Sequence, residues 1–196
     1  MKDWKGNTRS TFATLGASTH SDHDCEENDY YATDPKAANL LLEVEPELTD
    51  IWEPACGAGH LAGVFEQYNK LAAATDLIDR GYGKPNVDFL KSTHHHNGDI
   101  VTNPPFRYAL EFVQKSLDLI PEGRKVAMFL RIQFLEGKAR RKFFDEHPPK
   151  TVYVATSRIK CAMNGDFEST KGSAALYAWF VWQKGWKGET VVRWIN

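Results

Sequence analysis

The chain has 196 residues, of which 42% are hydrophobic and 26% are charged, a balance typical of one globular domain. Its longest apolar run, 174–182, is too short to span a membrane, and the N-terminus has no apolar signal core. The net charge of −2 excludes a protein that coats nucleic acid by electrostatics alone. Since Cys25, Cys56 and Cys161 are scattered and lack ligand spacing, we expect a cytoplasmic protein without a cysteine metal site.

The charge is unevenly distributed along the chain. Residues 1–120 hold 10 basic and 19 acidic residues, a net charge of −9, whereas residues 121–196 hold 14 and 7, a net charge of +7. A polyanionic substrate held by the second half would explain this division. The alternative is that these basic residues only line a solvated helix face.

The first 28 residues are polar and have neither helical nor strand periodicity, which predicts a disordered arm ahead of a single domain over 29–196. Ordered structure is expected from about Tyr30. A helix is expected to begin at Asp34-Pro35, with Asp34 as its N-cap and Pro35 at its first position, and to end before Pro46.

Beyond that helix, short apolar runs alternate with segments of helical period. Strands are expected at 51–53, 71–76, 87–90, 100–102, 125–130, 151–155 and 176–182, and helices at 60–68, 108–119 and 137–146. Such alternation predicts an α/β fold with a mostly parallel sheet and helices on both faces. The polar stretch 156–175 has no helical period and is expected to be a long loop.

A strand that ends at Glu53 runs into a turn with two glycines, Gly57 and Gly59, which opens the next helix. Such glycines let the backbone approach a bound ligand, although Gly-x-Gly also occurs in turns without one. Glu53 would repel a pyrophosphate and attract an ammonium group, which argues against a nicotinamide dinucleotide. Asp76 follows the next strand, where a carboxylate accepts hydrogen bonds from ribose hydroxyls, and a solvated aspartate is the alternative.

Three further segments carry weaker signals. Asp88 and Phe89, at the third expected strand, offer a carboxylate and an aromatic ring to a ligand, and plain core is the alternative for Phe89. Cys56 has no neighbouring His, Lys or Arg to lower its pKa, so we assign it no nucleophilic role. Consecutive histidines at 94–96 cannot all face one ion, and we interpret them as a solvated loop rather than a metal site.

The most informative segment is Asn103-Pro104-Pro105-Phe106, directly after an apolar strand. Two prolines fix two φ angles and remove two backbone donors, so carbonyl groups in the turn stay available as acceptors. The Asn103 side-chain oxygen and the Pro104 carbonyl can then accept both hydrogens of an amino group, while Phe106 stacks on the ring that carries it. A turn that only ends a strand would not require the flanking Asn and Phe.

This loop resembles the Asp/Asn/Ser-Pro-Pro-aromatic motif of S-adenosylmethionine-dependent amino-methyltransferases. Tyr30-Tyr31-Ala32-Thr33-Asp34-Pro35 resembles their cofactor-closing motif, and its place ahead of the glycine turn is similar to one class of DNA adenine-N6 methyltransferases. The resemblance covers residues 28 to about 183. It implies a Rossmann-like methyltransferase fold with a seven-stranded sheet, and direct methyl transfer without a covalent intermediate.

The resemblance also implies the site residues. The catalytic residues would be Asn103, Pro104, Pro105 and Phe106. The S-adenosylmethionine site would consist of Tyr31, Thr33, Glu53, Pro54, Ala55, Gly57, Gly59, Asp76, Leu77, Asp88, Phe89 and Asn103. A flipped base and its phosphates would be bound by Phe106, Arg131, Lys138, Arg140, Arg141, Arg158 and Lys160.

The short length and the aromatic run 177–182 make the chain similar to small phage and prophage methyltransferases, which implies a bacterial host cytoplasm. No separate target-recognition domain fits here, unlike in members that read long DNA sites. The same loop resembles that of ribosomal-RNA guanine-N2 and protein glutamine methyltransferases, and adenine N6 in RNA is a further alternative. A non-catalytic nucleic-acid-binding or anti-restriction module is the alternative from another class.

Overall fold

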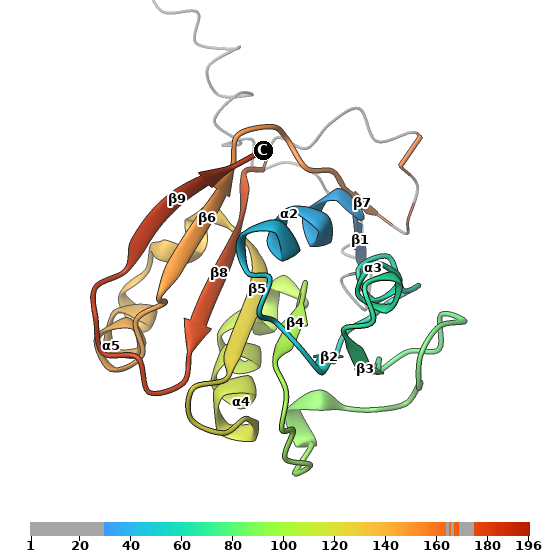
Figure 1. Cartoon of the computed structure of the whole chain (residues 1–196), viewed down its shortest axis with the longest axis horizontal. Coiled ribbons are helices and arrows are strands. Elements are labelled where there is room, and N and C mark those ends of the chain that lie inside the picture. The colour runs from blue at the N-terminus through green and yellow to red at the C-terminus, as the bar shows by residue number, and fades with distance from the viewer. Residues whose placement is uncertain (1–29, 164, 166, 169–174) are drawn as a thin grey trace, which may run out of the picture.

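A computed structural model describes residues 30–163, 165, 167–168 and 175–196 (Figure 1). The predicted N-terminal arm and Cys25 lie outside these residues. The elements are β1 (Tyr31–Thr33), α2 (Lys36–Val44), β2 (Ile51–Glu53), α3 (Ala62–Gln67), β3 (Leu71–Ala74), η1 (Phe89–Lys91), β4 (Ile100–Thr102), η2 (Phe106–Tyr108), α4 (Ala109–Leu119), β5 (Lys125–Arg131), η3 (Ile132–Leu135), α5 (Lys138–Glu146), β6 (Thr151–Ala155), β7 (Cys161–Met163), β8 (Tyr177–Gln183) and β9 (Val191–Ile195).

Seven strands form one sheet in the order β3-β2-β4-β5-β8-β6-β9. All neighbouring strands are parallel except β8, which runs antiparallel to both β5 and β6. The predicted α/β fold with a mostly parallel seven-stranded sheet is therefore confirmed. Within the described ranges, no helix is long and apolar enough to cross a membrane.

Helices cover both faces of the sheet, and each face has its own core. Residues of α2 and α3 pack on one face against Trp179, whereas residues of α4 and α5 pack on the other against Trp182 (Figure 1). Because β8 is covered on both sides, six consecutive residues, 177–182, are all buried. This explains why that strand reads as a continuous apolar run instead of an alternating one.

The first helix begins at Lys36, one residue later than the sequence predicts, and Pro35 instead of Asp34 holds the N-cap position. The Asp34 Oδ1 accepts a hydrogen bond from the Lys36 backbone N–H at 2.9 Å, and its carbonyl accepts one from Ala37 at 2.9 Å. The helix ends at Val44, before Pro46. Helix α3 is shorter than expected, since it covers six residues of the expected 60–68.

Three expectations from the sequence are wrong. No strand forms at 87–90, because Asp88 Oδ1 accepts the Leu90 N–H at 3.1 Å and starts the short helix η1 there. The strand at 177–183 is not the last one, since β9 follows and adds a parallel edge to β6. The expected loop 156–175 contains β7, which pairs antiparallel with β1 in a separate two-stranded sheet.

Candidate active site

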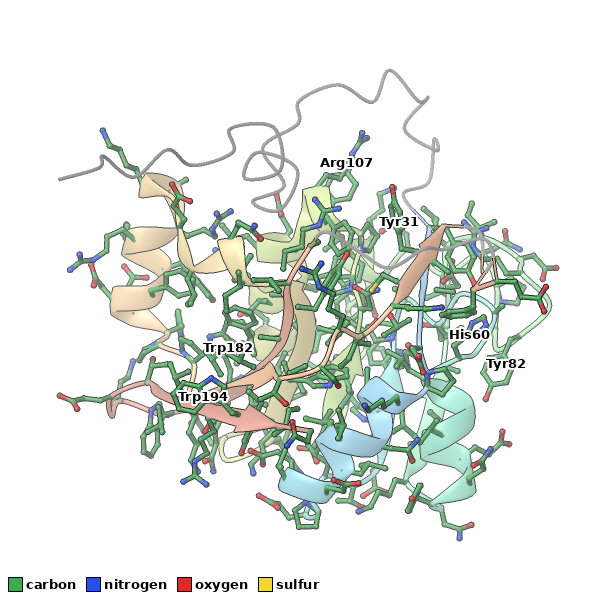
Figure 2. All side chains as sticks on the ribbon, turned by 90° about the horizontal axis from the view of Figure 1, so that it is seen from above. Tyr31, His60, Tyr82, Arg107, Trp182 and Trp194 are labelled. Atoms are coloured by element: carbon green, nitrogen blue, oxygen red, sulfur yellow. The ribbon has the colours of Figure 1, made fainter. Side chains whose placement is uncertain are left out.

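A cavity of about 460 Å³ lies where the chain leaves the carboxyl ends of β2, β3 and β4. Ligand sites of open α/β sheets form at this edge. The cavity collects most of the residues that the sequence predicts for the site, namely Tyr31, Thr33, Glu53, Pro54, Ala55, Asp76, Leu77, Asp88, Phe89, Asn103, Pro104, Pro105 and Phe106. Figure 2 shows Tyr31 and Arg107, another lining residue, near each other at one rim of the molecule.

Asn103, which directly follows β4, is held in one orientation by β1. Its Nδ2 donates to the Tyr31 carbonyl at 3.2 Å and lies 2.8 Å from the Thr33 Oγ1. Because a carbonyl oxygen only accepts, the nitrogen of the carboxamide must be on that side. The Oδ1 is buried and has no hydrogen-bond partner within the described part of the chain. Asn103 therefore offers the cavity an unused acceptor.

Glu53, the last residue of β2, is 2% exposed and offers a second unused acceptor. Its carboxyl group receives one hydrogen bond, from the Ala62 backbone N–H. Its Oε2 has no partner among the residues that the structure covers. Burial, together with the nearby negative charge of Asp76, raises the pKa of Glu53 well above its ordinary value. A cation placed beside Glu53 would relieve that penalty.

Asp76 joins the two loops that border the cavity. Its Oδ2 accepts the Gly57 N–H at 2.7 Å, and its Oδ1 accepts the Ile78 N–H at 2.9 Å. Each carboxylate oxygen has a second lone pair, so both still have capacity for a ligand hydroxyl. Asp76 is 9% exposed and lines the cavity, which is compatible with the ribose contact that the sequence predicts.

The two glycines of the turn do not line the cavity. Gly57 (φ +55°) and Gly59 (φ +83°) adopt backbone conformations that favour glycine. A Cβ on Gly57 would lie 2.4 Å from the Tyr30 ring, and one on Gly59 would lie 2.5 Å from the Tyr82 ring. The glycines therefore give room to two tyrosine rings, and their predicted contact with a ligand stays a prediction.

Asp88 and Phe89 border the cavity from η1. The Asp88 carboxylate caps η1 and pairs with Lys91 Nζ at 2.9 Å, a contact that lowers its pKa. The Phe89 side chain is 2% exposed, and its ring contacts Trp52 and Phe112 with centroid separations of 5.3 and 4.9 Å. Phe89 is thus a core residue whose remaining surface faces the cavity.

Phe106 lies among aromatic and basic neighbours. Its ring centroid is 5.6 Å from that of Tyr31 and 6.0 Å from that of Tyr177. The guanidinium carbon of Arg131, a predicted substrate ligand at the end of β5, is 4.6 Å from the Phe106 ring centroid. Arg131 also hydrogen-bonds the hydroxyl of Tyr177, whose pKa is raised by burial. The structure therefore brings Arg131 to the loop 103–106, against the ring that is predicted to stack on a base.

The predicted basic residues of α5 have local partners. The Arg140 guanidinium donates to the carbonyls of Gln133 and Glu136, just ahead of the helix. The Arg141 Nε lies 2.9 Å from an oxygen of Asp145, one turn further along α5. Helix α5 packs beside β6 and β8, on the far side of β5 from the cavity (Figure 1). Phosphate binding by this helix stays a prediction.

The remaining basic candidates lie in two places. Lys138 is exposed at the start of α5, and Arg158 is exposed in the connection between β6 and β7. The Lys160 carbonyl accepts the Asp34 N–H at 3.0 Å, and its Nζ donates to the Phe167 carbonyl at 3.3 Å. Lys160 therefore lies near β1, whereas Lys138 belongs to the α5 side.

Sequence reasoning missed a pair of residues that border the cavity. The Arg80 guanidinium carbon lies 4.0 Å from the Tyr30 ring centroid, and the Tyr30 hydroxyl accepts the Ala58 N–H at 3.2 Å. Burial raises the pKa of Tyr30. Tyr30 belongs to the quoted motif and could have been proposed, but nothing near Arg80 in the sequence signals a site.

Cys56 and the histidines at 94–96 lie in surroundings that disfavour a thiolate nucleophile and a metal site among the described residues. Burial, then the charges of Glu53 and Asp76, raise the pKa of Cys56 to about 12, which disfavours a thiolate. His96 Nε2 lies 2.6 Å from the Asp50 carbonyl. In the described ranges, no three His, Cys, Asp or Glu side chains are grouped as a metal site would require.

Neither a protein-family model nor a curated protein matches this chain. Solved structures do match it. A candidate class I S-adenosylmethionine-dependent methyltransferase from Listeria monocytogenes aligns with 95% of this chain and 71% of its own length, with a TM-score of 0.58 and 13% identity. A candidate RNA methyltransferase from Pyrococcus horikoshii aligns with 90% of this chain and 98% of its own length, with a TM-score of 0.57 and 14% identity.

The M protein of the type I restriction enzyme EcoKI is similar over a smaller part of its length. It aligns with 82% of this chain and 45% of its own, with a TM-score of 0.54 and 16% identity. At these identities the likeness concerns the fold and not the activity. The chain has the fold of class I S-adenosylmethionine-dependent methyltransferases.

Proposed function

We propose that this protein is an S-adenosylmethionine-dependent methyltransferase that modifies an exocyclic amino group, adenine N6 in DNA. One observation carries the proposal most directly. The Asn103 carboxamide is held by two contacts from β1 so that its oxygen, buried and without a partner among the described residues, remains as an acceptor at the cavity. An amine donor is the ligand group that satisfies it.

The cavity suits the cofactor. S-adenosylmethionine carries an ammonium group and ribose hydroxyls but no phosphate, and the carboxylates of Glu53 and Asp76 border the cavity. The free Glu53 Oε2 is placed at the end of β2 to accept from the ammonium, and Asp76 retains lone pairs for the ribose. When bound, the cofactor supplies a methyl group activated by a positively charged sulfur.

The catalytic loop then acts by alignment. Asn103 Oδ1 and the Pro104 carbonyl accept the two hydrogens of the target amine, which directs the nitrogen lone pair toward the methyl group. Phe106 stacks on the base that carries the amine, at the position where Arg131 now lies against its ring. No side chain becomes covalently modified, in agreement with the raised pKa of Cys56.

Three observations favour a nucleic acid as the substrate. Solved structures with this fold include the EcoKI M protein and a candidate RNA methyltransferase. Arg131, Arg107 and Lys91 lie at the catalytic loop or border the cavity. The second half of the chain has a net charge of +7. DNA adenine is preferred over RNA bases and protein glutamine because the Tyr30–Pro35 motif precedes the glycine turn, as in one class of adenine-N6 enzymes.

Mass spectrometry of nucleosides tests the proposal. Overexpression of the native chain in a host without adenine methylation should produce N6-methyladenine in DNA, and the Asn103→Ala chain should not. Methylated guanine or adenine in RNA would move the substrate to the RNA alternative. Transfer of tritium from labelled cofactor to neither DNA, RNA nor protein, by a chain that binds the cofactor, would favour a non-catalytic binding module instead.

A further inference from the structure

Strand β9 forms the outer edge of the sheet and carries an unusual amount of exposed apolar surface. Val191 and Val192 are each 46% exposed and Trp194 is 70% exposed, three of the eight large apolar side chains that are exposed in the described part of the chain. Among those residues, β6 is its one partner strand. Figure 1 shows β9 at the side of the sheet opposite β3, and Figure 2 shows Trp194 far from Tyr31. Exposed edge strands with apolar side chains are sites of strand pairing.

The backbone of β9 shows which groups are free for such pairing. The Val191 N–H donates to the Lys150 carbonyl at 3.1 Å, and the Ile195 carbonyl accepts the Thr156 N–H at 2.9 Å. In a parallel pair, alternate residues direct their backbone groups to the same neighbour, so 191, 193 and 195 bond to β6. The N–H and C=O groups of 192 and 194 therefore point to the open edge. The carbonyl of 190 does so too, because it lies opposite the Val191 N–H across a trans peptide bond.

We propose that two copies of this chain pair through β9, antiparallel, around a two-fold axis at Val191. A two-fold axis makes the contact isologous, so every pair of residues away from the axis occurs twice. Three antiparallel registers place outward backbone groups opposite one another, with the axis at 191, 192 or 193. Side-chain charge distinguishes them.

Residues 188–190 directly precede β9 and are not part of it in this structure, and the proposed dimer extends the strand through them. With the axis at Val191, Glu189 of each copy then lies opposite Arg193 of the other. This creates two ion pairs of opposite charge across the junction. An axis at 193 would place the two Arg193 side chains face to face, and an axis at 192 would leave Arg193 opposite Val191. Only the first register satisfies both charges, so charge complementarity selects it.

The same register gives the exposed indole a place to pack. Trp194 of one copy falls opposite Gly188 of the other, where the Trp186 ring takes the space that a Gly188 side chain would fill. The Trp186 ring already covers Gly188 within its own chain, since a Cβ there would lie 2.4 Å from Trp186. Trp194 would then meet an aromatic surface, and the pair of chains would bury both tryptophans. The cavity, at the carboxyl ends of β2 to β4, stays open in this arrangement.

Sedimentation of the full-length chain over a wide concentration range tests the pairing. The native chain should form a reversible dimer. Glu189→Arg should weaken the dimer at least about tenfold, because each copy then presents like charges at two positions. Arg193→Glu should do the same, and the double variant with exchanged charges should restore the native dimer constant. Glu43→Arg, the same charge change on the exposed side of α2, is the control and should have no effect.

Cross-linking checks the register. Residues at a non-hydrogen-bonded antiparallel pair have Cα atoms about 4.5 Å apart, which suits a disulfide. Val191→Cys should therefore form a covalent dimer under mild oxidation, well above the background of the native cysteines, whereas Val192→Cys should not. A chain that stays monomeric at every concentration, a charge exchange that fails to restore the dimer, or cross-linking through 192 instead of 191 would each overturn the proposal.

Discussion

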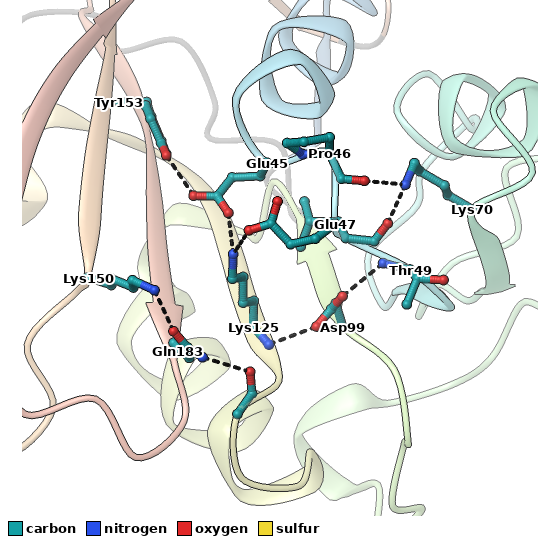
Figure 3. A network of polar contacts seen from close by, with 12 residues as sticks. Glu45, Pro46, Glu47, Thr49, Lys70, Asp99, Lys125, Lys150, Tyr153 and Gln183 are labelled. Carbon is teal, nitrogen blue, oxygen red and sulfur yellow. Dashed lines mark hydrogen bonds and ion pairs between the residues drawn. The ribbon is translucent and has the colours of Figure 1, made fainter.

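The two ends of one sheet bury their carboxylates in different ways. At the amino ends of β4 and β5, the Glu45 carboxylate accepts a hydrogen bond from Lys125 and another from the Tyr153 hydroxyl at 2.7 Å (Figure 3). The Asp99 carboxylate there accepts the N–H groups of Thr49 and Lys125 at 2.9 and 2.8 Å. Every oxygen of these two buried carboxylates has a partner.

At the carboxyl ends of β2 and β4 the pairing is incomplete. Within the ranges that the structure describes, Glu53 Oε2, Thr102 Oγ1 and Asn103 Oδ1 are buried without a partner. An unpaired buried acceptor costs free energy in the folded protein, so it persists where a ligand later satisfies it. The difference teaches that the paired end is built for stability, whereas the free acceptors of the unpaired end suit the ligand and the chemistry proposed for it.

Removal of a hydrogen-bonding partner at the paired end should have the largest effect on stability. Lys125→Met removes the cation that Glu45 and Glu47 share and leaves the Glu45 carboxylate buried and uncompensated. Hydrogen bonds to both glutamates outweigh the opposing effect of burial and raise the pKa of Lys125. We expect the free energy of unfolding to fall by about 3–5 kcal/mol, measured by urea denaturation. Cofactor affinity of the folded protein should stay unchanged. Native stability in this variant would contradict the structural role of the cluster.

Asn103→Ala, at the unpaired end, should show the reverse pattern. We expect methyl transfer to fall at least about 100-fold, because a preorganised acceptor at the reacting centre is lost. Cofactor affinity should remain near native. Stability should fall by only about 1–2 kcal/mol, because the two hydrogen bonds that Asn103 Nδ2 donates to β1 are lost, whereas the Oδ1 has no partner within the described chain to lose. Calorimetry with the demethylated cofactor and a tritium-transfer assay measure the two quantities. Gln114→Ala, an exposed amide on α4, is the control. Near-native transfer by Asn103→Ala would refute the mechanism.

Glu53→Gln should weaken cofactor binding by roughly 10–100-fold, the loss expected for a hydrogen bond to a charged group. Stability should change little or increase. Because burial raises the pKa of Glu53, the folded protein without ligand loses stability as the pH rises from the ordinary carboxyl value of 4.5 through the raised one. The ammonium of the cofactor favours the ionised form and reverses this preference.

Glu53 therefore predicts a pH dependence of binding. Below the raised pKa, cofactor binding should release a proton, and affinity should increase with pH until that pKa is reached. Calorimetry in buffers of different ionisation enthalpy measures the released proton. The Glu53→Gln protein should lack both the proton and the slope. A slope that survives this substitution would place the titrating group elsewhere.

Substitution of Thr33 should have the smallest effect on methyl transfer, and it should distinguish a role in positioning Asn103 from a role in binding the cofactor. Its Oγ1 lies 2.8 Å from Asn103 Nδ2, which makes it a positioning residue for the acceptor as well as a predicted neighbour of the cofactor. Thr33→Val should lower kcat about tenfold through one lost hydrogen bond, with KM for the nucleic acid unchanged. Thr33→Ser should retain the native rate. If Thr33→Val instead weakens cofactor binding and leaves kcat unchanged, contact with the methionyl group is its main role.

Local signals in the sequence were sufficient to predict the backbone elements that surround the cavity. The strand that ends at Glu53 and the turn after β4 occur as predicted, and the first helix begins within one residue of its predicted start. They share a physical basis, since side-chain caps, proline geometry and apolar period act over a few residues. Parallel strands align their carboxyl ends, and this brought Glu53, Asp76 and Asn103 to one cavity.

Other features escaped prediction because their cause is not local. The 87–90 segment is apolar enough for a strand, yet the Asp88 side chain competes for the backbone and starts a short helix. Strand β9 has no alternation that separates a core face from a solvent face, since Val191 through Trp194 are all exposed. Its place in the sheet depends on pairing with β6, forty positions earlier.

The sequence by itself determined the α/β architecture, the place of the cavity and the residue types that border it. The tertiary structure alone decided which polar atoms are free. Asn103 presents its oxygen to the cavity because Tyr31 and Thr33, about seventy positions earlier in the chain, bind its side-chain nitrogen. Likewise, Gly57 leaves space for the ring of Tyr30, a residue far from it in the sequence. The physical reason is that periodicity and turn chemistry are properties of neighbouring residues, whereas the satisfaction of a buried hydrogen-bonding group depends on every segment that packs against it.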